Sequence, residues 1–193
     1  MTARTTMANL IGELRGMTDA GADDYTIGLV AYWTDDQLQA ILDRNRIEVA
    51  NDALTHIDEY ADGGVLTVTR YYSHFGNYEA TSGGTAIFVV RDGTWNTVGT
   101  ALYTADYQRG EVIFSSATGA APYYLTGRSY DLNAAAADVW ERKAAQSASA
   151  SYSWSSDNMR VDKGAMRKDY IEQARYYRAR AGVKSVSVER GDC

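Results

Sequence analysis

The sequence predicts an α+β fold in which an α-helical bundle body of about four helices carries an inserted small antiparallel β domain. Two changes in hydrophobic period support this class. Apolar residues recur at helical spacing up to Gly63-Gly64, alternate as in strands to about 125, and return to helical spacing near Asp131. We therefore expect the following division: a helical body over 1–62 and 126–182, a β domain over 63–125, and a C-terminal tail over 183–193.

The first two helices are predicted from apolar stripes and a start signal. The first is expected over 5–17, where one face collects Met7, Leu10, Ile11 and Leu14. The second begins at Thr34, which forms a capping box with Gln37. Asp35 and Asp36 in the first turn suit the helix dipole, so they need no metal to explain them. The stripe that extends this helix to about 55 is Leu38, Ile41, Leu42, Val49 and Leu54.

The β domain is predicted from alternating residues and turn signals. Residues 65–72 carry a strand signature, and the strand over 86–90 ends at Asp92-Gly93, a strong turn dipeptide. Strands over 102–107 and 111–114 flank a short hairpin turn, and 123–125 is the last strand. Together these segments predict a small antiparallel sheet.

The last two helices are predicted on either side of a Ser-rich loop at 147–156. Ser129 or Asp131 caps a helix to about 150, and Asp162 caps a helix that Gly182 ends. Four alanines at 134–137 allow a neighbouring helix to approach closely. The expected inward residues of the first are Leu132, Ala136, Val139 and Trp140, and those of the second are Met166, Tyr170, Ala174 and Tyr177. We expect Ala136, Val139 and Trp140 to form a core or a subunit interface.

Charge is distributed unevenly along the 193 residues, whose net charge is −6. Residues 160–193 hold nine Lys/Arg against five Asp/Glu, whereas residues 1–159 hold ten against twenty. The acidic body argues against a protein that wraps DNA. The basic end is either a solvated helix face or a surface that docks on an acidic partner.

The sequence offers no catalytic set, so we expect no enzyme activity, no cofactor and no metal site. Cys193 is the only cysteine, and His56 and His74 lack a His or Cys partner at ligand spacing. No phosphate-binding loop, dinucleotide fingerprint or nucleophile elbow occurs. No apolar run is long enough to span a membrane, and polar residues interrupt the N-terminal segment where a signal peptide would be apolar. We expect a soluble protein assembled in a cytoplasm.

The aromatic residues leave two interpretations open. Tyr71, Tyr72, Phe75 and Tyr78, with Tyr103 and Tyr107, either fill the core of the sheet or form a surface that recognises a glycan or a protein. Alternation along a strand sends half of them inward in any case, which favours the core.

Three segments carry a resemblance to a known family. They are "YWTDDQLQAILDR" from Tyr32, "YDLNAAAADVWE" from Tyr130, and "ARYYRAR" from Ala174. Their order, with a Ser-rich loop before the last, resembles the head–tail connector (adaptor, head-completion) proteins of tailed bacteriophages. The resemblance covers roughly 32–54 and 123–181, and the β domain departs from the shortest members.

The resemblance implies a structural virion protein of the neck. Such proteins form a dodecameric ring beneath the portal protein, contact neighbouring copies and the stopper or tail components, and let double-stranded DNA pass through. The family's C-terminal region engages the portal. The residues that this implies as portal-binding here are Arg175, Arg178, Arg180, Val183, Lys184 and Val186. The alternative is a Tyr-rich β binding module carried on a helical support.

Overall fold

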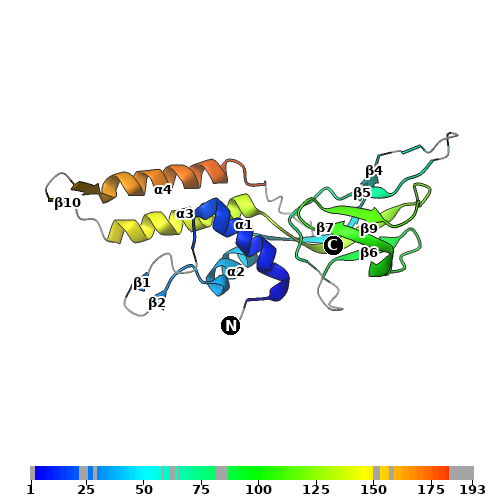
Figure 1. Ribbon diagram of the computed structural model, residues 1–193, viewed down its shortest axis with the longest axis horizontal. Coiled ribbons are helices and arrows are strands. Elements are labelled where there is room, and N and C mark those ends of the chain that lie inside the picture. Colours follow the sequence, from blue (N-terminus) through cyan, green and yellow to red (C-terminus); the bar gives the residue numbers. More distant parts are fainter. Residues whose placement is uncertain are drawn as a thin grey trace, which may run out of the picture. The chain divides into compact units, whose positions relative to one another are not determined.

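The computed structural model describes residues 3–21, 26–27, 30–57, 59–60, 64, 66–80, 87–149, 153–156 and 159–182. The chain divides into two compact units, Met1–Leu132 and Asn133–Cys193, which are described separately below (Figure 1). The first unit combines two helices with two antiparallel sheets, and the second is a pair of long helices joined by a strand hairpin. None of the helices in the described ranges has both the length and the apolar character needed to cross a bilayer.

Two helices open the first unit and lie against each other. A 3₁₀ turn, η1 (Thr5–Met7), leads into α1 (Ala8–Thr18), and α2 spans Asp35–Arg44. The predicted capping box of α2 is confirmed: Gln37 N donates to Thr34 Oγ1, and Thr34 N donates back to Gln37 Oε1. Along the chain, a short antiparallel strand pair comes after α1 and before α2: β1 (Thr26–Ile27) and β2 (Val30–Ala31).

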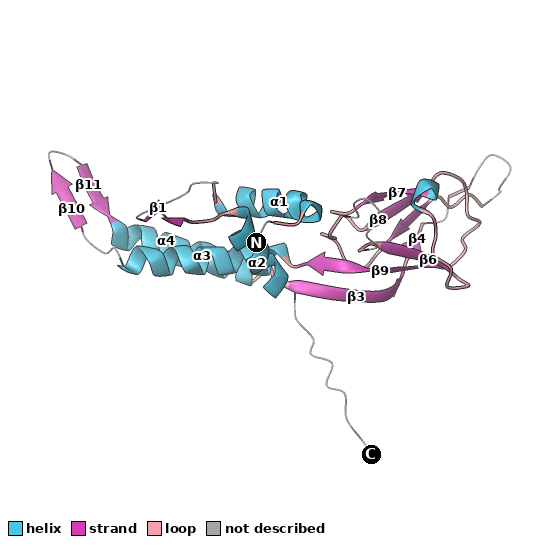
Figure 2. Ribbon diagram, turned by 90° about the horizontal axis from the view of Figure 1, so that it is seen from below, coloured by secondary structure: helices cyan, strands magenta, loops and turns pink. Residues whose placement is uncertain are grey.

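A three-stranded sheet follows α2 directly. Its order is β3 (Arg46–Ala53), β9 (Tyr123–Tyr130) and β6 (Val89–Asp92), all antiparallel. Figure 2 shows β3 and β9 side by side over most of their length. Their register runs from Arg46 opposite Tyr130 to Ala53 opposite Tyr124, and it shifts at a bulge between Val49 and Asp52.

A four-stranded sheet completes the first unit. Its order is β4 (Thr55–His56), β5 (Arg70–Tyr72), β8 (Glu111–Phe114) and β7 (Tyr103–Asp106), with η2 (Thr100–Leu102) just before β7. The β7–β8 hairpin confirms the turn expected around Gly110. The two sheets share one hydrophobic core: Val49, Leu54, Val68, Tyr71, Tyr78, Phe88, Val90, Tyr103, Val112, Phe114 and Leu125.

Aromatic packing organises this core. The ring of Tyr71 packs edge-on against Phe114 and Tyr123, with centroids 5.5 and 5.1 Å away. Its hydroxyl remains satisfied, because it lies 2.6 Å from Thr118 Oγ1 and donates to the carbonyl of Ala121. The core interpretation of Tyr71 is thus confirmed, as it is for Tyr78 and Tyr103.

The second unit is a helical hairpin. Its helices are α3 (Leu132–Ser149) and α4 (Lys163–Arg178), and the strand pair β10 (Ser153–Ser156) and β11 (Met159–Asp162) joins them. The Ser-rich loop expected at 147–156 is therefore partly helix and partly strand. Figures 1 and 2 both show α3 and α4 running side by side.

The expected fold class, a helical bundle with an inserted β domain, is wrong. Helices α1 and α2 belong to the same compact unit as both sheets. Strand β3 starts at Arg46, inside the segment expected to be helical, and β9 continues to Tyr130, beyond the expected insert. The sheets are therefore built from chain on both sides of the expected boundaries, and α1, α2 and both sheets belong to one mixed α/β unit.

Asn45 is the physical reason for the misplaced boundary. Its Nδ2 donates to the carbonyl of Ile41, and its own carbonyl accepts a hydrogen bond from Asp131 N, so the residue ends α2 and joins the chain to β9. Val49 lies seven residues after Leu42 and so fits a helical stripe, yet it is the buried residue of a strand with exposed neighbours.

Candidate functional site

The α3–α4 hairpin contains every residue of the predicted portal-binding and subunit-interface sets that the structure describes. At the start of α3 the small side chains of Ala134, Ala135, Ala136 and Ala137 are all buried. Val139 and Trp140 are buried as well, and the ring of Trp140 lies 5.4 Å from that of Tyr170 on α4. The three residues expected at a core or subunit interface therefore lie inside the single chain.

Arg178 has partners within the hairpin, although its side chain is 45% exposed. One of its terminal nitrogens donates to both Asp138 and Glu141 of α3 at 2.8 Å. The hydrogen bond to Glu141, followed by that to Asp138, raises the pKa of the Arg178 guanidinium. The two carboxylates come from successive turns of one helix face, so this arginine joins α4 to α3.

Arg180 also takes part in packing. Its guanidinium carbon lies 3.6 Å above the ring centroid of Tyr176, in a cation–π arrangement. The carbonyl of Arg180 accepts a hydrogen bond from Nδ2 of Asn133, at the start of α3. Two of the three arginines predicted to bind a portal thus have partners within the hairpin.

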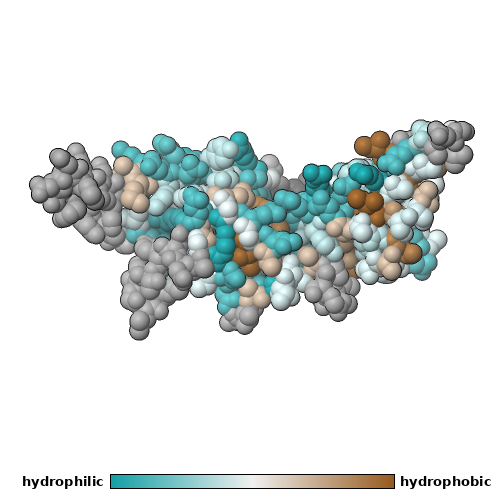
Figure 3. Space-filling view, viewed as in Figure 1, coloured by the Kyte–Doolittle hydropathy of each residue, from teal (hydrophilic) through white to brown (hydrophobic). Residues whose placement is uncertain are grey.

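Arg175 remains available on the outer face of α4. It is exposed and forms no ion pair with any described residue, and the same holds for Arg167 and Lys168 earlier on the helix. Figure 3 shows a predominantly hydrophilic surface over α4. The other predicted portal-binding residues, Val183, Lys184 and Val186, lie outside the described residues.

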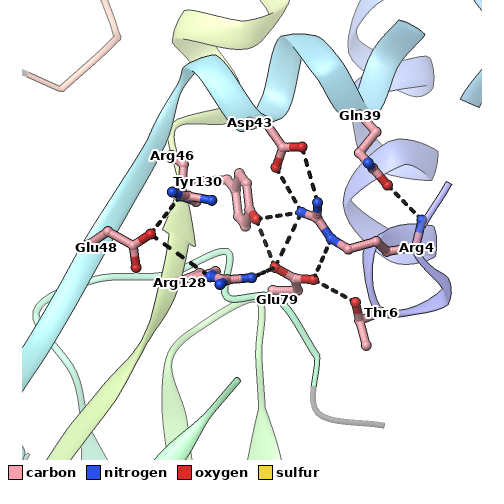
Figure 4. Close-up of polar contacts among 9 residues, drawn as sticks. All are labelled: Arg4, Thr6, Gln39, Asp43, Arg46, Glu48, Glu79, Arg128 and Tyr130. Atoms are coloured by element: carbon pink, nitrogen blue, oxygen red, sulfur yellow. Dashed lines mark hydrogen bonds and ion pairs between the residues drawn. The ribbon is translucent and has the colours of Figure 1, made fainter. Parts of the chain in front are cut away.

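A polar cluster in the first unit is the most extensive network of charged side chains in the described chain (Figure 4). Glu79 is fully buried at its centre and accepts hydrogen bonds from Arg4 Nε at 2.9 Å, Thr6 Oγ1 at 2.6 Å and Tyr130 Oη at 2.8 Å. Arg4 also forks onto Asp43, with distances of 2.7 and 3.1 Å. We call Arg4, Thr6, Asp43, Glu79 and Tyr130 the Glu79 cluster.

The Glu79 cluster shifts the proton affinities of its members. Burial alone would raise the pKa of Glu79, but the hydrogen bonds from Thr6, Tyr130 and Arg4 together outweigh it and lower that pKa. Burial and the neighbouring Glu79 carboxylate raise the pKa of the Tyr130 hydroxyl. The cluster therefore holds an ionised carboxylate and a neutral phenol at neutral pH. Its role is to tie the N-terminal segment, α2 and β9 together.

A Ser–His–Asp set also occurs, but its geometry is not that of a nucleophilic triad. Asp52 Oδ1 lies 2.7 Å from Nδ1 of His74, which orients the imidazole. Ser73 Oγ, however, donates to Asp52 Oδ2 at 2.6 Å and lies 2.6 Å from the Tyr78 hydroxyl. The serine therefore shares the carboxylate with the histidine and is not activated by it. No sequence motif indicates this network, because Asp52 comes from β3 whereas Ser73 and His74 follow β5.

A pocket of about 400 Å³ lies between α1 and the β7–β8 hairpin. Its lining includes Glu13, Asp106, Tyr78 and Gln108. Burial, and then the negative charge of Asp106, raise the pKa of Glu13. Within the described ranges no three His, Cys, Asp or Glu side chains are grouped so as to hold a metal ion.

Comparison with known proteins gives no assignment. The sequence matches no family model, and none of the curated proteins compared with it is significantly similar.

Proposed function

We propose that the protein is a structural adaptor of the head–tail junction of a tailed bacteriophage. In this proposal it forms a ring beneath the portal, joins the DNA-filled head to the tail, and leaves a channel for DNA. The proposal is supported by a sequence resemblance and by the distribution of charge on α4. The segments 32–54 and 123–181 resemble the connector family, and the second of them includes the whole α3–α4 hairpin.

The observation that carries the proposal is the contrast between the basic residues of α4. Arg178 is paired with two carboxylates of α3, whereas Arg167, Lys168 and Arg175 are exposed and unpaired among the described residues. A helix whose packing is already completed by one arginine, and which keeps other cations outside, is suited to docking on an acidic partner. In the proposal that partner is the portal, with the tail after 182 extending the contact.

The net negative charge of residues 1–159 also favours a channel through which DNA passes, rather than a surface that binds DNA. Residues 1–159 carry twenty acidic and ten basic side chains. Repeated around a ring, such a surface repels the phosphate backbone, so DNA slides past without adhering. Stopper or tail components would then contact the opposite side of the ring.

The alternative of a Tyr-rich recognition surface has less support. Tyr71, Tyr78 and Tyr103, which such a surface would need, are buried in the core between the sheets. Only Phe75 of the expected aromatic group is among the exposed large hydrophobic residues.

Electron microscopy of assembled particles tests the proposal. The full chain is added to portal-bearing heads that lack it, and the necks are imaged. A ring of this protein in contact with the portal is the expected result. If the chain does not bind to heads, or binds only to the shell away from the portal vertex, the adaptor proposal is wrong.

A triple variant locates the contact. Arg167→Ala, Lys168→Ala and Arg175→Ala together should leave the fold intact and weaken attachment to heads, with a stronger loss at higher salt. The control removes an equal number of exposed basic charges from the first unit: Arg44→Ala, Arg46→Ala and Arg109→Ala. If the two triple variants attach to heads equally well, the exposed basic residues of α4 do not form the docking surface.

A further inference from the structure

The tip of the hairpin that follows β6 holds a tryptophan in an exposed position. Trp95 is 52% exposed. The turn that carries it is locked onto one carboxylate oxygen, because Asp92 Oδ1 accepts hydrogen bonds from Thr94 N at 2.9 Å, Thr94 Oγ1 at 2.8 Å and Asn96 N at 3.0 Å. These bonds, that from the Thr94 hydroxyl foremost, lower the pKa of Asp92.

The backbone at Trp95 adopts a conformation that large residues rarely take. Its φ is 68°, in the left-handed region, and its N–H donates to the carbonyl of Asp92 at 2.9 Å. Gly93 packs so closely on Pro122 that a Cβ there would lie 2.9 Å from the proline Cγ. Strained backbone at a non-glycine residue persists only where the surroundings enforce it, and it is concentrated at functional sites.

A second aromatic ring supports the tryptophan from below. Trp95 stacks on Tyr124 of β9 with centroids 4.7 Å apart and planes inclined by 17°. Tyr124 is paired with Arg91 of β6, so their side chains lie on the same face of the sheet. With one ring face on Tyr124, the exposed surface of Trp95 forms a flat platform held in a fixed orientation.

The surroundings of this platform are polar. Thr94, Asn96 and Thr97 are exposed. The Thr94 hydroxyl is used within the loop, since it donates to Asp92 Oδ1 and accepts from Asn96 Nδ2, so the side chains offered to a ligand are those of Asn96 and Thr97. A flat aromatic ring surrounded by small donors and acceptors differs from a protein-binding hot spot, which lies at the centre of a wider, water-excluding surface.

We propose that Trp95 and Tyr124 form a carbohydrate-binding platform. A pyranose ring has apolar C–H groups on one face and hydroxyl groups around its edge. The face would stack on Trp95, and the hydroxyl groups would pair with the exposed amide of Asn96 and the exposed hydroxyl of Thr97. Because the loop is already ordered, little conformational entropy is lost on binding. This inference does not depend on the adaptor proposal, since the same platform would serve any protein that meets a glycan surface.

Nuclear magnetic resonance on the full-length protein tests the inference. The chain has four tryptophans, so four indole N–H signals are expected, and the Trp95 signal is the one missing from Trp95→Phe. Cellohexaose, maltohexaose and chitohexaose are titrated separately up to millimolar concentration. With at least one of them we expect a saturable shift of the Trp95 signal that spares the other three indoles.

Two variants make the result specific. Trp95→Ala should lower the affinity at least about tenfold, because it removes the stacking surface. Leu102→Ala, which truncates a side chain that is 56% exposed, should bind as the unaltered protein does. Absence of a saturable shift with all three sugars overturns the proposal. An affinity of Trp95→Ala equal to that of the unaltered protein, measured by isothermal titration calorimetry because this variant lacks the Trp95 signal, overturns it as well. If no sugar binds but Trp95→Ala loses attachment to heads or tails, the site is a protein contact and the carbohydrate assignment is wrong.

Discussion

Arg4 and Glu79 are 75 positions apart in the sequence, yet the guanidinium Nε of one donates a 2.9 Å hydrogen bond to the buried carboxylate of the other. The Arg4 side chain is one-third exposed and that of Glu79 is not exposed at all. Glu79 therefore depends on its partners for the solvation that water would otherwise supply. This dependence makes the pair sensitive to substitution from either side.

Glu79→Gln should destabilise the protein by about 1–3 kcal/mol, because the buried cluster loses its charge and Arg4 loses one carboxylate partner. Urea unfolding followed by circular dichroism measures the change. Glu48→Gln is the control, since that carboxylate is 60% exposed while pairing with Arg46 and should matter by less than about 0.5 kcal/mol. Equal effects of the two substitutions would contradict the role given to burial.

The Glu79 cluster should also make stability depend on acid pH. The folded-state pKa of Glu79 is below its ordinary value of 4.5, so its contribution is present above that pH and is lost as the pH falls through the folded pKa. The difference in free energy of unfolding between the unaltered protein and Glu79→Gln should therefore narrow below about pH 4.5. Thermal melts across the acid range test this expectation, and a difference that stays constant would contradict it.

Trp140→Ala should cost about 3–5 kcal/mol, because it leaves a cavity beside Tyr170 in the α3–α4 hairpin. Differential scanning calorimetry provides the measurement. Met166→Ala on α4 is the matched control, since Met166 is exposed although the helical pattern placed it on the inward face. A melting temperature unchanged by Trp140→Ala would show that the hairpin does not rely on this side chain.

Arg178→Ala and Arg175→Ala should have different effects on stability. The first removes the ion pairs with Asp138 and Glu141, and we expect a loss of up to about 1 kcal/mol that shrinks as salt is added. The second removes an exposed cation without a partner in the described residues and should leave the melting curve unchanged. Chemical denaturation at low and high salt distinguishes the two variants. A larger loss of unfolding free energy from Arg175→Ala than from Arg178→Ala would contradict the view that Arg178 joins the helices and Arg175 does not.

Gly110→Ala should destabilise the protein by at least about 2 kcal/mol. Gly110 has a φ of +67°, and an added Cβ would lie 2.1 Å from the carbonyl oxygen of Phe75. Gly99→Ala is the control, because a Cβ there meets nothing within 4 Å and the backbone φ is −64°. Comparable melting temperatures for the two variants would contradict the close packing of the β7–β8 turn.

Local signals were sufficient to predict several elements. The capping box at Thr34 and Gln37 forms as expected, and the turn at Gly110 joins two strands close to their expected positions. Both signals act over a few residues, so neighbouring chain alone determines them. The end of α2 was missed because Asn45 is held partly by Asp131, a residue far along the sequence.

The Glu79 cluster and the Trp95–Tyr124 platform could not be predicted from the sequence either, because both depend on contacts between residues far apart in the chain. Nothing near Glu79 indicates that it is buried, because its partners Arg4 and Tyr130 come from the N-terminal segment and from β9. The turn at Asp92-Gly93 was predicted, but the platform was not, since it requires Tyr124 from another strand. Residue type and local period cannot identify contacts that only tertiary structure creates.

The pairing of β3 with β9 has a consequence for synthesis on the ribosome. Tyr130 must emerge from the ribosome before it can pair with Arg46 in the longest strand ladder of the described residues. Its hydroxyl must also emerge before it can accept a hydrogen bond from Arg4, 126 positions earlier. Contacts of such long range slow folding, because a large loop must be closed before any of them forms. The nascent first unit is therefore expected to stay open until nearly all of it has been translated, and then to fold in one late step.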